Sequence, residues 1–73
     1  MAVVKVIEIL AESEASWEDA AQQALNEVAR TVRNIKTVYI KDFQAIVENN
    51  RIVRYRVNAK VSFLVEPHHD LQA

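Results

Sequence analysis

The sequence predicts an α+β fold with the element order strand, helix, strand, strand. Apolar residues recur at helical spacing between positions 17 and 33, which predicts one amphipathic helix. Residues 51–66 alternate between apolar and polar side chains, which predicts a half-buried strand. Residues 3–10 and 35–48 are rich in Val and Ile, which predicts two further strands. The strand at 51–66 is expected to pair antiparallel within a three-stranded sheet.

The first strand, Val-Val-Lys-Val-Ile-Glu-Ile-Leu at residues 3–10, is followed by a short acidic and polar connection at residues 11–15. A helix start comes next. The Ser16 hydroxyl can accept a hydrogen bond from the backbone N–H of Asp19, and the Asp19 side chain can reach back to Ser16. This reciprocal pattern predicts the N-terminus of the helix.

The helix is expected to run from Trp17 to about Arg33, with Arg30 also in its last turn, where cations complement the carbonyl end. Its apolar stripe consists of Trp17, Ala21, Ala24, Val28 and Val32, widened by Ala20 and Leu25. The alanines on this stripe predict a helix that lies close to a sheet. Trp17 could instead be a stacking platform for a planar ligand, but its phase with the alanines favours packing.

The strand from Ile35 to Glu48 alternates imperfectly. One face is expected to carry Thr37, Tyr39 and Phe43, and the other Val38, Ile40 and Ile46. Both faces therefore hold apolar residues, and either a bulge near residues 42–45 shifts the register or both faces are covered. The face with Val38, Ile40 and Ile46 is the predicted contact surface, because one helix covers only one side of the sheet.

Asn49 and Asn50 are the predicted hairpin turn, because the chain has no glycine and Asn is the next best residue for positive φ. The last strand, Arg51 to Glu66, alternates cleanly. Its apolar face carries Val53, Tyr55, Val57, Ala59, Val61, Phe63 and Val65, and its polar face Arg54, Arg56, Asn58, Lys60 and Ser62. Residues 1–66 are expected to form one domain, followed by a tail at 67–73.

Length, charge and composition exclude several classes of function. The chain has 73 residues, a formal net charge of −1 and no cysteine. The charge balance argues against a nucleic-acid or polybasic membrane partner, and the missing cysteine excludes disulfide scaffolds, zinc fingers and thiol catalysis. Without a long apolar run or a signal-peptide pattern, a cytoplasmic protein is expected. A core this small barely offsets conformational entropy, so self-association is predicted over a monomer with scattered exposed apolar residues.

An enzyme is not expected. The two histidines, His68 and His69, fall in the predicted tail, and a chain without glycine has no phosphate-binding loop. For a metal ion, Glu66, His68, His69 and Asp70 are candidate ligands across subunits, with a solvated tail as the alternative.

Two further polar groups have two interpretations each. Glu12 and Glu14 are also candidates for a cation site, with a solvated loop as the alternative. The basic row Arg54, Arg56 and Lys60 is interpreted as solvated or paired at an interface, and anionic-ligand binding by Arg56 stays open.

Four segments together resemble the dodecin family over about residues 2–66. They are Val-Lys-Val-Ile-Glu-Ile-Leu at 4–10, Ser-Trp-Glu-Asp-Ala-Ala at 16–21, Arg-Asn-Ile at 33–35 and Tyr-Arg-Val-Asn-Ala-Lys-Val-Ser-Phe at 55–63. The resemblance implies an antiparallel sheet that partly wraps one helix, and twelve copies that form a hollow homododecamer. It also implies storage or buffering of a flavin (riboflavin, FMN or FAD) as the function. The sequence resembles the branch of the family whose members lack the flavin-stacking tryptophan, some of which are associated with calcium or other ions.

The resemblance also implies where a flavin would bind. The position of the stacking tryptophan holds Thr37, and the position of a ring-binding glutamine holds Arg56. Asp42 stands where some members hold the ribityl chain, and Tyr39 is a partial replacement for the missing ring. Thr37 cannot stack and Arg56 has no acceptor, so flavin binding is expected to be weak or lost. The alternative is a calcium-type ion-binding shell, or a purely structural one.

Overall fold

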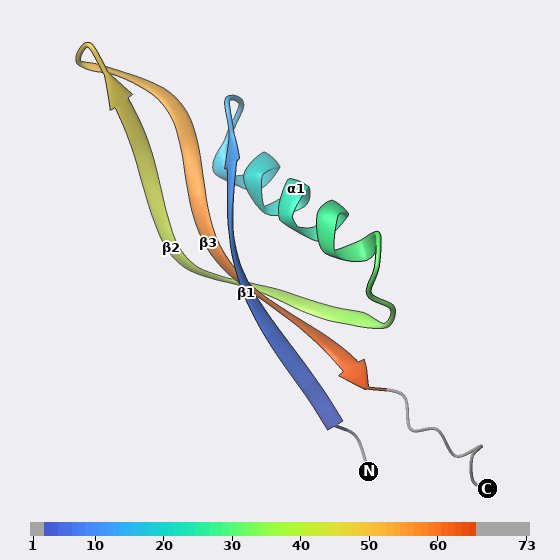
Figure 1. Ribbon diagram of the computed structural model, residues 1–73. Helices are drawn as coiled ribbons and strands as arrows, with labels where there is room; N and C mark the ends of the chain where they lie inside the picture. The colour runs from blue at the N-terminus through green and yellow to red at the C-terminus, as the bar shows by residue number, and fades with distance from the viewer. Residues whose placement is uncertain (1–2, 66–73) are drawn as a thin grey trace, which may run out of the picture.

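The computed structural model describes residues 3–65 and has the predicted element order (Figure 1). The elements are β1 (Val3–Ser13), α1 (Trp17–Ala29), β2 (Ile35–Glu48) and β3 (Arg51–Val65). The sheet is antiparallel with the order β1-β3-β2, so the last strand of the sequence is the central one. Helix α1 lies on one side of this sheet (Figure 1). No helix within residues 3–65 is long and apolar enough to cross a membrane.

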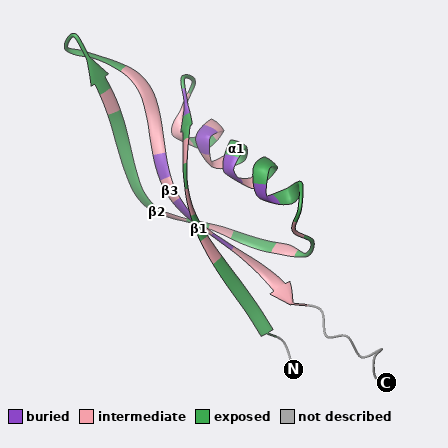
Figure 2. Cartoon of the chain, in the orientation of Figure 1, coloured by how far each residue is buried: buried purple, intermediate pink, exposed green. Residues whose placement is uncertain are grey.

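The core lies between α1 and the central strand β3 (Figure 2). Its buried apolar residues are Ala20, Ala24 and Val28 of the helix and Val57, Ala59 and Val61 of the strand. Alanine side chains on the helix allow its backbone to approach the sheet closely, as the apolar stripe predicts. The clean alternation of β3 is confirmed, because every second residue from Val57 to Val61 is buried.

The helix begins as predicted but with a different acidic contact. The Ser16 hydroxyl accepts a hydrogen bond from the Asp19 backbone N–H at 2.9 Å. The Asp19 carboxylate does not reach back to Ser16 and instead accepts a 2.6 Å hydrogen bond from the Ser13 hydroxyl. Ser13, at the end of β1, also accepts a bond from the backbone N–H of Ala15 at 2.9 Å. This serine therefore ties the end of β1 to the first turn of α1.

The predicted boundaries of β1 and α1 were each wrong by a few residues. Strand β1 continues to Ser13, because it stays paired with β3 as far as Tyr55. Helix α1 ends at Ala29 rather than near Arg33. Its last hydrogen bonds tighten to an i→i−3 pattern, since the backbone N–H of Thr31 donates to the carbonyl of Val28.

The two arginines predicted for the last turn of the helix lie beyond its end. Arg30 is the C-cap residue, and the Arg33 guanidinium still donates to the terminal carbonyl of Ala29 at 3.5 Å. Three asparagines, Asn34, Asn49 and Asn50, adopt positive φ values of 63°, 54° and 62°. The predicted turn at Asn49 and Asn50 is thus confirmed.

The predicted faces of β2 were partly wrong, because the register against β3 shifts at three places. One shift lies between Ile40 and Asp42, just before the predicted position. As a result, Val38, Ile40 and Phe43 pair with Val61, Ala59 and Val57 and share the helix-facing side. Ile46, paired with Arg54, lies on the opposite side.

The side of the sheet away from α1 is called the outer face below. It carries Val4, Val6, Glu8, Leu10 and Glu12 of β1, Arg54, Arg56, Asn58, Lys60, Ser62 and Leu64 of β3, and Thr37, Tyr39, Asp42, Gln44 and Ile46 of β2. The predicted contact surface was therefore partly wrong. Val38 and Ile40 lie on the helix-facing side, and the exposed apolar residues of the outer face are mainly those of β1.

Candidate ligand-binding surface

The outer face carries all four residues that the family resemblance assigned to a flavin pocket. Their partners along β3 fix their positions: Thr37 faces Ser62, Tyr39 faces Lys60, Asp42 faces Asn58, and Gln44 faces Arg56 itself. Ser62 and Arg56 are six positions apart along β3, which is roughly 20 Å at about 3.3 Å per residue. One copy of the chain therefore places Asp42 near Arg56 but keeps Thr37 well away from Arg56.

Tyr39 is the one aromatic side chain on the outer face of residues 3–65, and it is 61% exposed. The neighbouring Thr37 hydroxyl is hydrogen-bonded to the hydroxyl of Ser62 across the strands. A planar ligand on this face would therefore meet a tyrosine ring and a pair of hydroxyls.

Arg56 is held in place by an acidic partner on β1. One carboxylate oxygen of Glu12, Oε2, accepts from Arg56 Nε at 2.8 Å and from Arg56 Nη2 at 2.6 Å. The other oxygen, Oε1, accepts from Arg54 Nε at 3.1 Å. A further Arg56 donor, Nη1, reaches the side-chain oxygen of Gln44 at 3.2 Å. The Glu12 carboxylate thus lies between two guanidinium groups.

A second polar group lies further along the outer face. The Glu8 carboxylate pairs with the Lys41 ammonium at 3.4 Å. The hydrogen bond from the Asn58 side chain, together with Lys41, lowers the pKa of Glu8 below its ordinary value of 4.5. The hydrogen bonds from Arg56 do the same for the pKa of Glu12. Both carboxylates are therefore stabilised in their charged form.

This charge arrangement predicts acid sensitivity. A carboxyl whose pKa is lower in the folded state stabilises the fold above its ordinary pKa, and that stabilisation is lost as the pH falls through the folded value. The thermal midpoint of the protein is expected to drop as the pH falls below about 4.5. The double variant Glu8→Gln/Glu12→Gln should show a weaker dependence of the thermal midpoint on pH over this range, measured by calorimetry at fixed subunit concentration. A variant that falls as steeply as the wild type would contradict this assignment.

A sequence profile of the dodecin family matches residues 3–66, which is most of the chain. The chain belongs to the dodecin family. Dodecins are non-enzymatic binding proteins, and membership implies a homo-oligomer that binds a small ligand. The expectation of a non-enzymatic protein with the fold order strand, helix, strand, strand is confirmed.

Known dodecins resemble this one in sequence and in structure. The calcium dodecin of Mycobacterium tuberculosis (strain ATCC 25618 / H37Rv) is 33% identical over 67 residues, which cover 92% of this chain and 94% of the relative. Its crystal structure, described as a calcium-chelating immunodominant antigen, matches with a TM-score of 0.77 and 32% identity over 89% of this chain and 93% of that one. A variant of Thermus thermophilus dodecin in which one arginine is replaced by alanine matches with a TM-score of 0.86 and 27% identity, over 92% of this chain and 98% of that one.

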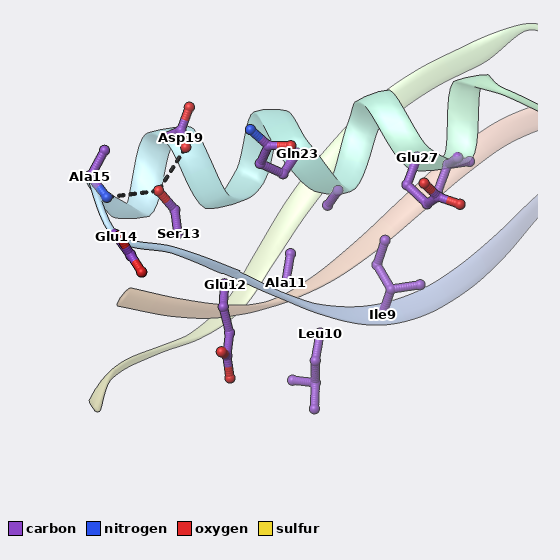
Figure 3. A pocket seen from close by; sticks show the side chains of 12 residues that line it. Ile9, Leu10, Ala11, Glu12, Ser13, Glu14, Ala15, Asp19, Gln23 and Glu27 are labelled. Carbon is purple, nitrogen blue, oxygen red and sulfur yellow. Dashed lines mark hydrogen bonds between the residues drawn. The ribbon is translucent and has the colours of Figure 1, made fainter. Parts of the chain in front are cut away.

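Residues 3–65 of this dodecin contain no group of three His, Asp or Glu side chains placed to hold an ion. Four of the predicted metal ligands, Glu66, His68, His69 and Asp70, lie outside the described residues. Glu12 faces the arginines, and Glu14 is the first residue after the end of β1. Both line a groove of about 740 Å³ between β1 and α1. Figure 3 shows Glu12 pointing away from the helix, while Ser13 points towards it.

Trp17 of this dodecin is a packing residue, as the helical spacing favoured. Its ring meets Tyr55 edge to face, with centroids 4.9 Å apart, and Phe43 in the same way at 5.8 Å. The indole N–H donates to the backbone carbonyl of Gln44 at 3.0 Å. The side chain is thus part of the contact between helix and sheet and is not available as a platform on the outer face.

The contact between Glu12 and the two arginines is a feature that the sequence prediction missed. The sequence predicts a polar connection at residues 11–15, whereas Glu12 in the structure belongs to β1 and continues the strand alternation of Glu8 and Leu10. The alternation of β1 can be extended to residue 12, and the opposite strand carries Arg54 and Arg56 on the same face. These two patterns together are the signal that predicts the contact.

Proposed function

We propose that this dodecin is a self-assembling small-ligand-binding protein whose site lies on the outer face and is completed by a second copy of the chain. One observation carries the proposal: the pocket positions share a face, yet Ser62, the partner of Thr37 on β3, is six positions from Arg56. A ligand of flavin size would need the Thr37 end of one copy and the Arg56 end of another. A hollow homododecamer is the assembly that the family suggests.

Exposed apolar residues support an interface on this face. Val4, Val6 and Leu10 of β1 are 52%, 55% and 63% exposed in the single chain, and Tyr39 is comparably exposed. These side chains lie on the outer face, where the helix cannot cover them. Contact with another copy would remove this apolar surface from water, and a small core benefits from such burial.

The same face supports weak flavin binding. Thr37 provides no ring, and Arg56 provides donors that Glu12 and Gln44 already engage. Tyr39 remains as a partial stacking surface and Asp42 as an acceptor. The proposed function is therefore small-ligand binding and storage with low affinity for riboflavin, FMN or FAD.

The direct test is a titration of ligand-stripped protein with riboflavin and FMN, followed by flavin fluorescence, beside sedimentation velocity at the same concentration. We expect a large assembly and little quenching at tens of micromolar flavin. Tight, saturable quenching would contradict weak binding, and a monomer in sedimentation would contradict the shared site.

Calcium binding is the second candidate, favoured by the 33% identity to the calcium dodecin of M. tuberculosis. Within residues 3–65, Glu8 and Glu12 are paired with basic side chains. A calcium site would therefore have to draw its oxygen ligands from several copies. Calorimetric titration with Ca²⁺ and with Mg²⁺ tests this: a calcium-specific heat and a higher melting temperature would support it, and identical weak responses would reject it.

A further inference from the structure

We propose that Glu12 acts as an internal competitor for anionic ligands and so decides which class of ligand the outer face accepts. Its carboxylate occupies the guanidinium edge of Arg56 that a phosphate group would otherwise take. The inference rests on the proposed function, because it concerns the ligand class of the same surface. With the charged Glu12 side chain in place, phosphate-bearing ligands are excluded from the Arg56 guanidinium. A neutral side chain at position 12 would let them bind there.

The contact has the geometry with which arginine holds an oxyanion. Arg56 presents the pair Nε and Nη2, one planar edge of its guanidinium group, to Glu12 Oε2 at 2.8 and 2.6 Å. Both donors converge on this one oxygen, and the same pair of N–H groups can bond to an oxygen of a carboxylate or of a phosphate. A carboxylate on this edge therefore stands where a ligand phosphate would bind.

Glu12 also engages Arg54. Its second oxygen, Oε1, accepts from Arg54 Nε at 3.1 Å, and Arg54 Nη2 lies 3.8 Å from a Glu48 oxygen. Two guanidinium groups therefore converge on one carboxylate. Removing the charge of Glu12 would leave both arginines beside each other with only Glu48 to balance them, which is a site for an anion.

The contact is held by the fold and is accessible from solvent. Glu12 and Arg56 are direct cross-strand partners of β1 and β3. The next residue, Ser13, is fixed by its hydrogen bond to Asp19, so the end of β1 is tied to the helix. The side chains of Glu12 and Arg56 are 35% and 34% exposed, which lets a small ion reach them.

The charges of the surrounding face are balanced. The outer face carries the acidic Glu8, Glu12 and Asp42 and the basic Arg54, Arg56 and Lys60, and two neighbouring side chains pair with it, Lys41 with Glu8 and Glu48 with Arg54. Because the positive and negative charges of this surface balance, it has no net attraction for anions. Removing the Glu12 carboxylate would leave an excess of positive charge at Arg54 and Arg56, and these two side chains would then attract an anion. The wild type is therefore expected to show no preference for FMN over riboflavin, although FMN differs by a phosphate.

The experiment compares Glu12→Gln with the wild type in calorimetric titrations with inorganic pyrophosphate at low salt. We expect pyrophosphate to bind the variant at least about tenfold more tightly, since charge-assisted hydrogen bonds of this strength become available. The gain should disappear in the double variant Glu12→Gln/Arg56→Gln and weaken in 0.5 M salt, where exposed charges are screened. Glu12→Ser, which removes charge and bulk, provides a second variant if Glu12→Gln does not assemble.

Glu14→Gln is the matched control, because it removes the same charge two residues away, and Glu14 has no ion pair within residues 3–65. Equal gains in Glu12→Gln and Glu14→Gln would mean that net charge alone acts, and they would overturn the proposal. Riboflavin and FMN titrations separate this inference from the proposed function. If either flavin binds the wild type tightly, the proposed low flavin affinity fails, while the pyrophosphate result still decides the role of Glu12.

Discussion

Replacing Trp17→Ala is expected to lower the free energy of unfolding by about 3 kcal/mol, near the lower end for large aromatic residues because Trp17 is half-buried. The ring touches Tyr55 of β3 and Phe43 of β2, so it joins the first helical turn to two strands at once. Its removal opens a gap that the neighbouring alanines cannot fill. Urea titrations followed by far-ultraviolet circular dichroism measure the loss, because the only tryptophan is then gone as a fluorescent probe.

The matched variant is Trp17→Phe, which keeps an aromatic ring and removes the indole N–H that donates to the Gln44 carbonyl. Its cost is expected to be about 1 kcal/mol, the usual net contribution of one hydrogen bond. Both titrations must be made at one subunit concentration, since assembly changes apparent stability. A cost for Trp17→Ala no larger than that for Trp17→Phe would show that the ring contacts contribute little.

Local patterns predicted much of this fold. The alternation of β3 identified its buried face. In a central strand that is covered on one side only, apolar residues point to the covered side and polar residues to the other, so the sequence alternates. Ser16 identified the helix start, and Asn49 and Asn50 identified the turn, since each acts through bonds or backbone angles within a few residues. These features depend on nearby groups alone, which is why one sequence suffices to find them.

The mistaken predictions involve contacts between distant segments. Asp19 was expected to close its own helix start, but the Ser13 hydroxyl from β1 takes its carboxylate. Phe43 was assigned to the wrong face, because the shift at Lys41 depends on how β2 registers against β3. The contact of Glu12 with Arg54 and Arg56 needs β1 and β3 to be paired as well. The candidate site therefore depended most on information that the sequence pattern alone does not contain.

Replacing Thr37→Trp is expected to bring back flavin binding. Thr37 is exposed on the outer face, so a larger side chain fits there without disturbing the core. Stacking of one planar ring on an aromatic side chain contributes roughly 1–3 kcal/mol, which corresponds to riboflavin binding about five- to more than hundredfold more tightly. Quenching of riboflavin fluorescence measures this gain directly, with riboflavin chosen because it carries no phosphate to interact with Arg56.

Thr37→Val is the control for this gain, because it keeps the size and branching of threonine and removes only the hydroxyl that bonds to Ser62. If the site is completed by a second copy, the new affinity should also require the assembled protein and vanish under conditions that dissociate it. Equal riboflavin affinities for Thr37→Trp and Thr37→Val would mean that no second surface faces position 37. A gain that persists in the separated chain would place both halves of the site on one copy, which the roughly 20 Å between Thr37 and Arg56 argues against.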